Sequence, residues 1–261
     1  MGDEQIRARD EAVTELVVPT RFRGPTSSGN GGWSAGAIAA LLDPAHGSAV
    51  TVTLRRPPPL ETPMDVATVG NGLVATADGA TVLEAEPAAT EPVRVEPVPA
   101  DEARSAEAGY PGLDGHPFPQ CFACGTGREA GDGLRIFPGQ VSDQGDLVRA
   151  AATWTPHESL SEDWHEYSGA QRRVSLPVTW AALDCVGAWA ADMAERMMVL
   201  GRMTARVTSL PVVGEEHVVV GLARSADGRK EHTSASIYDG RGDLVGVAEH
   251  VWFAIDPRAF A

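Results

Sequence analysis

Two stretches of this chain share a pattern of small residues: residues 33–42 read WSAGAIAALL, and residues 184–191 read DCVGAWAA. Each has the composition of a buried helix. Segments 33–70 and 184–221, overlaid without a gap, match at Gly36/Gly187, Ala37/Ala188, Ala39/Ala190, Ala40/Ala191, Thr53/Thr204, Arg55/Arg206 and Gly70/Gly221. The pattern predicts an internal duplication, in which one helix and its sheet occur twice and meet at a seam.

Short strand-like segments surround both helices. Strands are expected before the helices at 15–22, 134–141 and 147–154, and after them at 49–56, 65–69, 73–77, 81–86, 203–208, 217–224, 231–238 and 244–253. Asn-Gly and Asp-Gly pairs between them favour tight turns. A helix followed by a meander excludes a doubly wound parallel sheet, where strands and helices alternate throughout. The order predicts an α+β fold with an antiparallel sheet wrapped around a central helix.

The chain divides into two units at a change of composition. Residues 1–88 form the first expected unit and residues 118–261 the second. Between them, residues 89–117 are rich in Pro, Ala and Glu with little apolar periodicity. They are expected to be a linker that wraps the surface and is too polar to form a core.

Composition limits the possible partners and location. Asp and Glu outnumber Lys and Arg by 36 to 21, for a net charge of -15, which argues against a nucleic-acid partner. No apolar run reaches the roughly 18 residues that span a bilayer, and residues 1–9 are charged rather than signal-like. Three cysteines do not suggest a disulfide framework. The expectation is a soluble, cytoplasmic protein without membrane contact.

Three short motifs and the order of elements resemble the hotdog superfamily, and specifically the double-hotdog thioesterases, in which two such units are fused. The motifs are Asn30-Gly31-Gly32-Trp33, Arg55-Arg56-Pro57 and Trp180-Ala181-Ala182-Leu183-Asp184, and the resemblance covers roughly residues 15–88 and 118–255. It implies two fused hotdog units, hydrolysis of an acyl thioester such as acyl-CoA, and no cofactor. Fused hotdog units often pair again through sheet edges, so a homo-oligomer is compatible with the resemblance.

The resemblance also implies a site at the start of a central helix. In the family, backbone N–H groups there hold the thioester carbonyl, often at a glycine pair, and a carboxylate further along a helix activates water. A helix N-terminus stabilises the developing oxyanion, and glycine permits close approach. Gly31 and Gly32 match the glycine pair, but the acid position seven residues later is Ala39.

The second copy has the opposite defect. Asp184 matches the acid, but seven residues earlier lies Pro177, which has no N–H to donate. The gapless overlay instead places Trp33 opposite Asp184, so the two helix registers differ by six residues, and neither gives the first copy a carboxylate. The complementary defects predict one working site, with Asp184 facing Gly31 and Gly32 across the seam.

Further site residues follow from the resemblance to acyl-CoA thioesterase II. Thr204 falls at the position of a strand hydroxyl, and Glu249 near that of a glutamine, where a second carboxylate would raise one pKa. We therefore expect Asp184, Thr204 and Glu249 to be catalytic. Substrate binding is expected from Asn30, Gly31, Gly32, Arg55 and Arg206.

Structural roles compete with these assignments. Asp184 could instead hydrogen-bond a loop, Asn30 could simply cap the helix, Thr204 could be an ordinary strand residue, and Arg55 and Arg206 could be solvated strand ends. Two functions compete with hydrolysis on the same fold. A protein of this kind could bind an acyl thioester or another hydrophobic ligand without catalysis, and hydration of enoyl thioesters would need an Asp–His pair near the helix entry, which the sequence does not provide.

Cys121 and Cys124 form a Cys-x-x-Cys pair with His116 just before it. The pair could bind a metal, act as a redox dithiol, or form a plain turn with buried thiols. No second pair follows at zinc-ligand spacing, and Cys185 is the only other thiol. The sequence therefore predicts no metal site.

Overall fold

A computed structural model describes residues 14–43, 47–161 and 171–256. The charged residues 1–9, on which the expectation about a signal sequence partly depends, lie outside these ranges. Among the described residues, no helix is long and apolar enough to cross a membrane.

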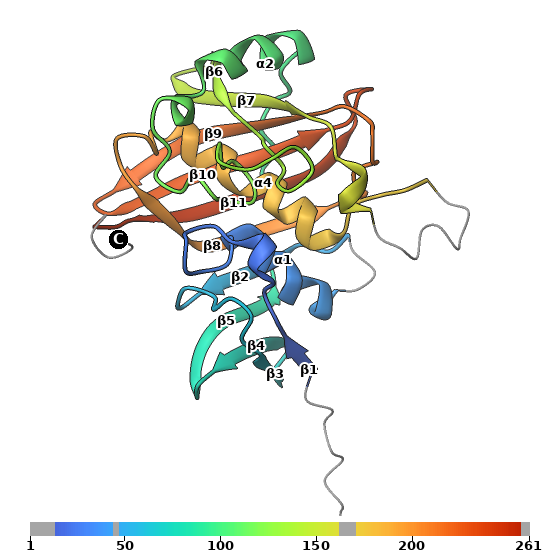
Figure 1. The fold of residues 1–261 in the computed structure, drawn as a ribbon, viewed down its shortest axis with the longest axis vertical. Coiled ribbons are helices and arrows are strands. Elements are labelled where there is room, and N and C mark those ends of the chain that lie inside the picture. Colours follow the sequence, from blue (N-terminus) through green and yellow to red (C-terminus); the bar gives the residue numbers. More distant parts are fainter. Residues whose placement is uncertain (1–13, 44–46, 162–170, 257–261) are drawn as a thin grey trace, which may run out of the picture.

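The described strands form one antiparallel sheet in the order β1-β3-β4-β5-β2-β8-β11-β10-β9-β7-β6 (Figure 1). The first half contains β1 (Thr14–Leu16), β2 (Val50–Leu54), β3 (Met64–Val69), β4 (Gly72–Ala77) and β5 (Ala80–Pro87). The second contains β6 (Gly139–Gln144), β7 (Leu147–Trp154), β8 (Met198–Val207), β9 (His217–Asp227), β10 (Lys230–Tyr238) and β11 (Leu244–Ala254). The order β1-β3-β4-β5-β2 corresponds to β7-β9-β10-β11-β8, and the two sets join where β2 pairs with β8. The expected antiparallel α+β architecture is confirmed.

Two helices lie side by side against this sheet, near its centre (Figure 1). Helix α1 spans Gly31–Leu42 and packs on β2, β4, β5 and β8, whereas α4 spans Leu176–Ala190 and packs on β7 to β11. Glycine allows the helices to approach closely: a Cβ added at Gly32 would lie 2.5 Å from Asp184 Cβ, and one at Gly36 2.7 Å from Trp180 Cβ. The contact between α1 and α4 is the seam at which parts from both halves meet.

The starts of the helices decide between the two registers. When Gly31 and Leu176, the first residues of α1 and α4, are aligned, Ala39 falls opposite Asp184. The gapless overlay fails beyond the helices, because Gly70 lies in the turn after β3, at φ 63°, while Gly221 lies within β9. The halves share an order of elements, but their common origin stays a prediction.

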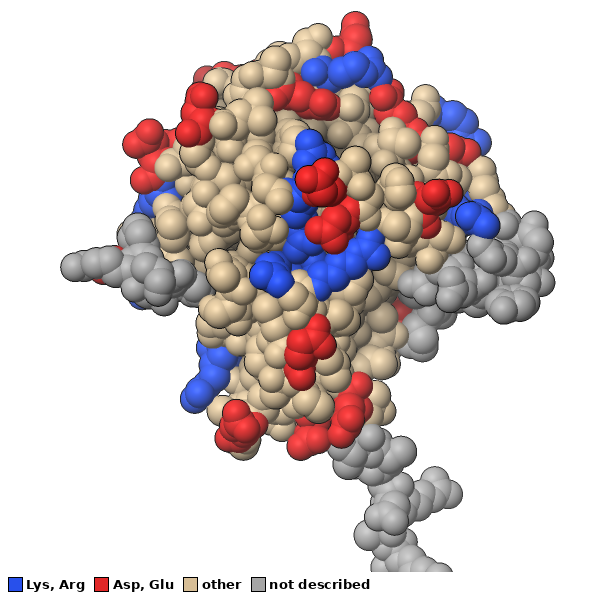
Figure 2. Space-filling view, viewed as in Figure 1, with Lys and Arg blue, Asp and Glu red and all other residues tan. Residues whose placement is uncertain are grey.

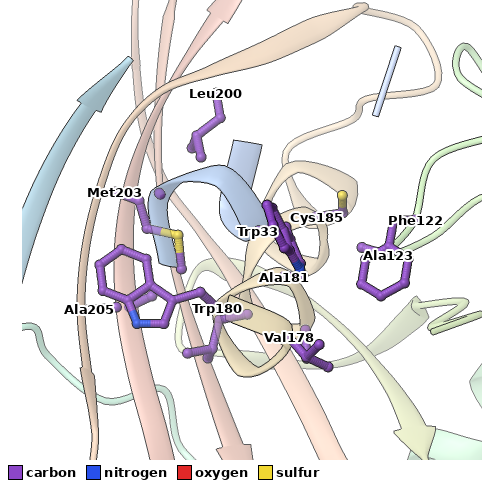
Figure 3. Close-up of a cluster of buried hydrophobic side chains, with 14 of the residues drawn as sticks. Trp33, Phe122, Ala123, Val178, Trp180, Ala181, Cys185, Leu200, Met203 and Ala205 are labelled. Carbon is purple, nitrogen blue, oxygen red and sulfur yellow. The ribbon is translucent and has the colours of Figure 1, made fainter. Parts of the chain in front are cut away.

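Two apolar clusters lie on opposite faces of the second half of the sheet. The main core lies between the sheet and the two helices, and Figure 3 shows part of it, including Trp33, Trp180, Leu200 and Met203. On the other face, α2 (Ala100–Ala106) and the chain before it cover β7, β9 and β10, so that Val95 and Ala103 are fully buried. The expectation that residues 89–117 are too polar for a core was wrong, because a few well-spaced apolar side chains suffice to cover a sheet face.

The short 3-10 helices are η1 (Thr20–Phe22), η2 (Glu107–Gly109), η3 (Pro111–Leu113) and η4 (Glu158–Leu160).

Candidate active site

A cavity of about 580 Å³ opens where the two halves meet. Its walls come from the loop before α1, the end of β2, the loop at residues 118–124, α4, and strands β8, β10 and β11. Asn30, Gly31 and Asp184 line it together with three cysteines. The cavity therefore contains the glycine end of α1 and the acid of α4, as the sequence predicted.

Asp184 is anchored to the first half of the molecule by one carboxylate oxygen. Its Oδ2 accepts hydrogen bonds from the Gly32 backbone N–H at 3.0 Å and from Asn30 Nδ2 at 2.9 Å. Its Oδ1 is also buried, and no described residue donates a hydrogen bond to it. Asp184 lines the cavity, and Oδ1 is its carboxylate oxygen without a described hydrogen-bond partner.

Burial changes the acidity of this carboxyl group. The side chain is 2% exposed, and desolvation raises the pKa of Asp184 to about 7, while the hydrogen bond from Gly32 acts in the opposite direction. A carboxyl group with this pKa is ionised in a large fraction of molecules at neutral pH and still accepts a proton readily. These are the properties that a general base requires.

Asn30 combines the two roles considered for it. Its side-chain Oδ1 accepts from the Trp33 backbone N–H at 2.8 Å and so caps α1, while its Nδ2 donates to Asp184. The expectation for Gly32 needs a correction: its N–H donates to Asp184 itself and not to an open substrate position. Gly31, the first residue of α1, lines the cavity, and the N–H groups of a first helical turn have no partner within the helix.

Thr204 and Glu249 are not brought to this site. The two are neighbours on β8 and β11, but neither lines the cavity. Thr204 Oγ1 lies 2.9 Å from Thr51 Oγ1, and Glu249 forms an ion pair with Arg224 at 2.5 Å. On β8 the buried Met203 and Ala205 belong to the core, so Thr204, between them, projects from the other face of the sheet. The expectation that Thr204 and Glu249 act together with Asp184 as catalytic residues is therefore corrected.

The two predicted arginines also separate. Arg55 lies at the cavity, with its guanidinium 2.6 Å from Glu84, whereas Arg206 pairs with Glu91 at 3.2 Å and is not part of the wall. Sequence reasoning missed three other cations that line the cavity, namely Arg56, Arg202 and Lys230. Arg56 follows a predicted residue directly, but Arg202 and Lys230 give no sequence signal because the strand pairing brings them there. On the face in Figure 2, a group of basic side chains lies near the middle with acidic side chains directly beside it, and further acidic side chains are spread around the edge.

All three cysteines lie in the cavity wall, which sequence reasoning did not foresee. Cys185 follows Asp184 on α4, and its Sγ is 3.8 Å from Cys121 Sγ and 3.8 Å from Asp184 Oδ2. Hydrogen bonds from the Cys124 and Cys185 thiols lower the pKa of Cys121, whereas burial raises that of Cys124. In the sequence, only the Cys-x-x-Cys pair pointed to a cysteine cluster. Cys185 is 61 residues further along the chain than Cys124, and only the fold brings it to the pair.

The architecture is the hotdog fold, with an antiparallel sheet around a central helix in each half. A hotdog-fold protein from Alicyclobacillus acidocaldarius is 13% identical over 96% of both chains, with a TM-score of 0.60. The tesB protein of Mycobacterium avium subsp. paratuberculosis is 13% identical over 89% of both chains at a TM-score of 0.54, and an acyl-CoA thioesterase II from Mycobacterium marinum is 11% identical over 94% of both chains at 0.52. No family model and no curated protein matches the sequence. At these identities the similarity establishes the fold.

Proposed function

We propose that the protein hydrolyses acyl thioesters of the acyl-CoA type in the cavity between its two halves. The observation that carries the proposal is the buried Asp184 carboxylate, held by Gly32 and Asn30 with Oδ1 left for a water. The thioesterase names of structural neighbours that cover nearly the whole chain support the same reaction class.

The reaction follows from these positions. Asp184 Oδ1 accepts a proton from a water molecule, and the resulting hydroxide oxygen attacks the thioester carbonyl carbon. The negative charge that develops on the carbonyl oxygen is stabilised by the Gly31 N–H and by the positive end of α1. When the tetrahedral intermediate collapses, the carbon–sulfur bond breaks and the thiolate leaves, taking up the proton that Asp184 had accepted.

The two ends of the substrate match different walls of the cavity. Apolar side chains suited to an acyl chain include Phe118, Met198, Leu200 and Trp252, and the cations Arg55, Arg56, Arg202 and Lys230 suit the phosphates of a CoA carrier. A carrier without phosphates would leave these cations without a role in binding.

The test is the release of free thiol from a panel of acyl-CoAs of graded chain length. Asp184→Asn keeps an oxygen for the Gly32 N–H but cannot accept a proton, so we expect at least about a hundredfold loss of kcat with an intact fold. The matched control is Glu249→Gln, which changes a carboxylate outside the cavity and should retain activity.

Wild-type rates in Asp184→Asn would disprove the assignment of the base. The alternative function, binding without hydrolysis, is favoured by the fact that Gly32 and Trp33 N–H groups are already engaged by Asp184 and Asn30. A rise in melting temperature with acyl-CoA but no thiol release from the wild type would support that alternative.

A further inference from the structure

Three sulfur atoms from distant parts of the chain converge in the cavity wall. Cys121 and Cys124 come from the loop after η3, Cys185 comes from α4, and their Sγ atoms all lie within 4.8 Å of one another. All three are free thiols and at most 6% exposed. The cluster plays no part in the hydrolysis proposed above, and packing alone does not require three sulfurs to meet.

The spacing of the sulfurs distinguishes between a disulfide and a metal site. Cys121 and Cys185 Sγ are 3.8 Å apart, whereas bonded sulfurs lie about 2.05 Å apart. Two thiolates at about 2.3 Å from a tetrahedral Zn²⁺ are separated by about 3.8 Å. The observed distance excludes a bond between these sulfurs and fits two ligands of one zinc ion, as it also fits the hydrogen bond between two thiols that the metal-free protein forms.

His116 has the orientation of a hydrogen-bond donor to this cluster. Its Nδ1 accepts from the Phe118 backbone N–H at 2.8 Å, so the proton of the neutral ring is on Nε2, which lies 3.3 Å from Cys124 Sγ. A histidine that binds metal through Nε2 instead needs a protonated Nδ1 facing an acceptor. His116 is therefore placed to donate to the Cys124 thiolate and not to bind the metal.

A second donor reaches the cluster from α1. Asn30 Nδ2 lies 3.7 Å from Cys121 Sγ. Three thiolates and one Zn²⁺ carry a net charge of -1, and N–H groups directed at the sulfurs stabilise such a charge in a buried site. The cluster thus has both the sulfur ligands and the outer donors of a thiolate metal centre.

We propose that Cys121, Cys124 and Cys185 bind one Zn²⁺ ion, with the fourth coordination position facing the cavity. All three cysteines line the cavity, and three protein ligands with one open position are typical of zinc sites accessible to small molecules. The ion links the loop at 121–124 to α4 one residue after Asp184, and so fixes this wall relative to the acid. Metal binding by the three sulfurs does not require that the protein hydrolyse thioesters, although Cys185 contacts Asp184.

The experiment is metal titration of the full-length protein, reduced and stripped with a chelator. Co²⁺ serves as the spectroscopic probe, because thiolate ligands give charge-transfer absorption in the near ultraviolet and a tetrahedral site gives visible bands. We expect saturation at one equivalent and displacement by one equivalent of Zn²⁺. Cys124→Ser and Cys185→Ser should each lose the charge-transfer signal or bind at least tenfold more weakly.

Two histidine variants form a matched pair. His116→Gln removes the donor to Cys124 and should keep the one-to-one stoichiometry with about 10- to 100-fold weaker binding. His232→Gln changes a histidine that lines the cavity away from the sulfurs and should leave binding unchanged. Equal weakening in both would contradict the assigned role of His116.

If the cysteine variants do not fold, thiol reactivity of the wild-type protein tests the proposal instead. Zinc should protect all three thiols from a disulfide reagent, and chelator should make them reactive. Absence of a thiolate-to-cobalt band would overturn the proposal, as would unchanged binding in the cysteine variants. A mass two hydrogens lower without reductant, lost on reduction, would identify a disulfide pair instead and also overturn it.

Discussion

The halves of this molecule have the same order of strands around one helix each, yet they contribute different groups to the cavity. Helix α1 contributes an amide-bearing start and has Ala39 at the position of the acid, whereas α4 contributes Asp184 and begins at Leu176-Pro177, where proline has no N–H. Each half lacks what the other provides. A site built from both halves needs only one helix start with N–H groups and one carboxylate.

The equivalent place on the other side of the seam is filled. Ala39, Leu176 and Trp180 surround a cavity of about 10 Å³, against about 580 Å³ at Asp184. Trp180 occupies that region, and Gly36 on α1 leaves space for it. This place therefore has neither a carboxylate at the Ala39 position nor an open cavity.

The largest expected effect concerns the burial of a carboxyl group in α4, at the position where α1 has the apolar Ala39. It tests how the ionisation of Asp184 changes the free energy of unfolding. Its pKa is raised in the folded state, so between about pH 4 and 7 the folded protein holds a proton that the unfolded chain has released. Stability should fall as pH rises through this window and level off above it, by roughly 4 kcal/mol for a shift of about 3 units. Urea unfolding of wild type and Asp184→Asn from pH 4 to 8 should show the variant gaining relative stability by about this amount.

Activity gives an independent measure of the same group. Only the ionised carboxylate acts as a base, so kcat should rise with pH through about 7 and then become constant. If the difference in unfolding free energy between the wild type and Asp184→Asn did not change with pH, Asp184 would already be ionised in the folded state at low pH.

The next effect tests the close contact of the two helices. Gly32→Ala would place a Cβ 2.7 Å from the Trp180 carbonyl oxygen and 2.5 Å from Asp184 Cβ, so α1 and α4 must separate. We expect a loss of about 3 kcal/mol in unfolding free energy, measured by urea denaturation, together with loss of thiol release. Gly109→Ala is the control, since an added Cβ there meets no atom within 4 Å. Equal stability of the two variants would contradict the packing role of Gly32.

The sequence predicted the architecture and the contact of Asp184 with the start of α1, but not which other side chains surround that contact. Alternating strands, tight turns and the order of elements depend on local patterns, and Asp184 is conspicuous in an apolar helix. Thr204 and Glu249 could not be excluded because the side of a strand that faces the helices is set by pairing and a register shift. Cys185 and Arg202 reach the cavity only through tertiary packing, which no spacing in the sequence encodes.

A smaller effect tests the outer face of the second half, which residues 95–106 cover among the residues that the structure describes. Val95 is fully buried there against β9 and β10, while Val93, two residues earlier, is 58% exposed. Val95→Ala should lower the unfolding free energy by about 2 kcal/mol, because it leaves a cavity. Val93→Ala should change it by less than about 0.5 kcal/mol, and neither variant should alter kcat. If both were neutral, residues 89–117 would not contribute to the core.

The smallest effect separates two arginines on the same face of β8. Arg202 lines the cavity, with its Nε 3.2 Å from Thr53 Oγ1, whereas Arg206 pairs with Glu91 outside it. Arg202→Gln should raise KM for acyl-CoA by about threefold, the scale of one partly solvated ion pair, with kcat unchanged. The same variant should leave KM for an acyl-pantetheine unaltered, because that substrate lacks the nucleotide phosphates. Arg206→Gln should change neither KM, and a matching rise for both substrates in Arg202→Gln would instead place this arginine beside the acyl or pantetheine part.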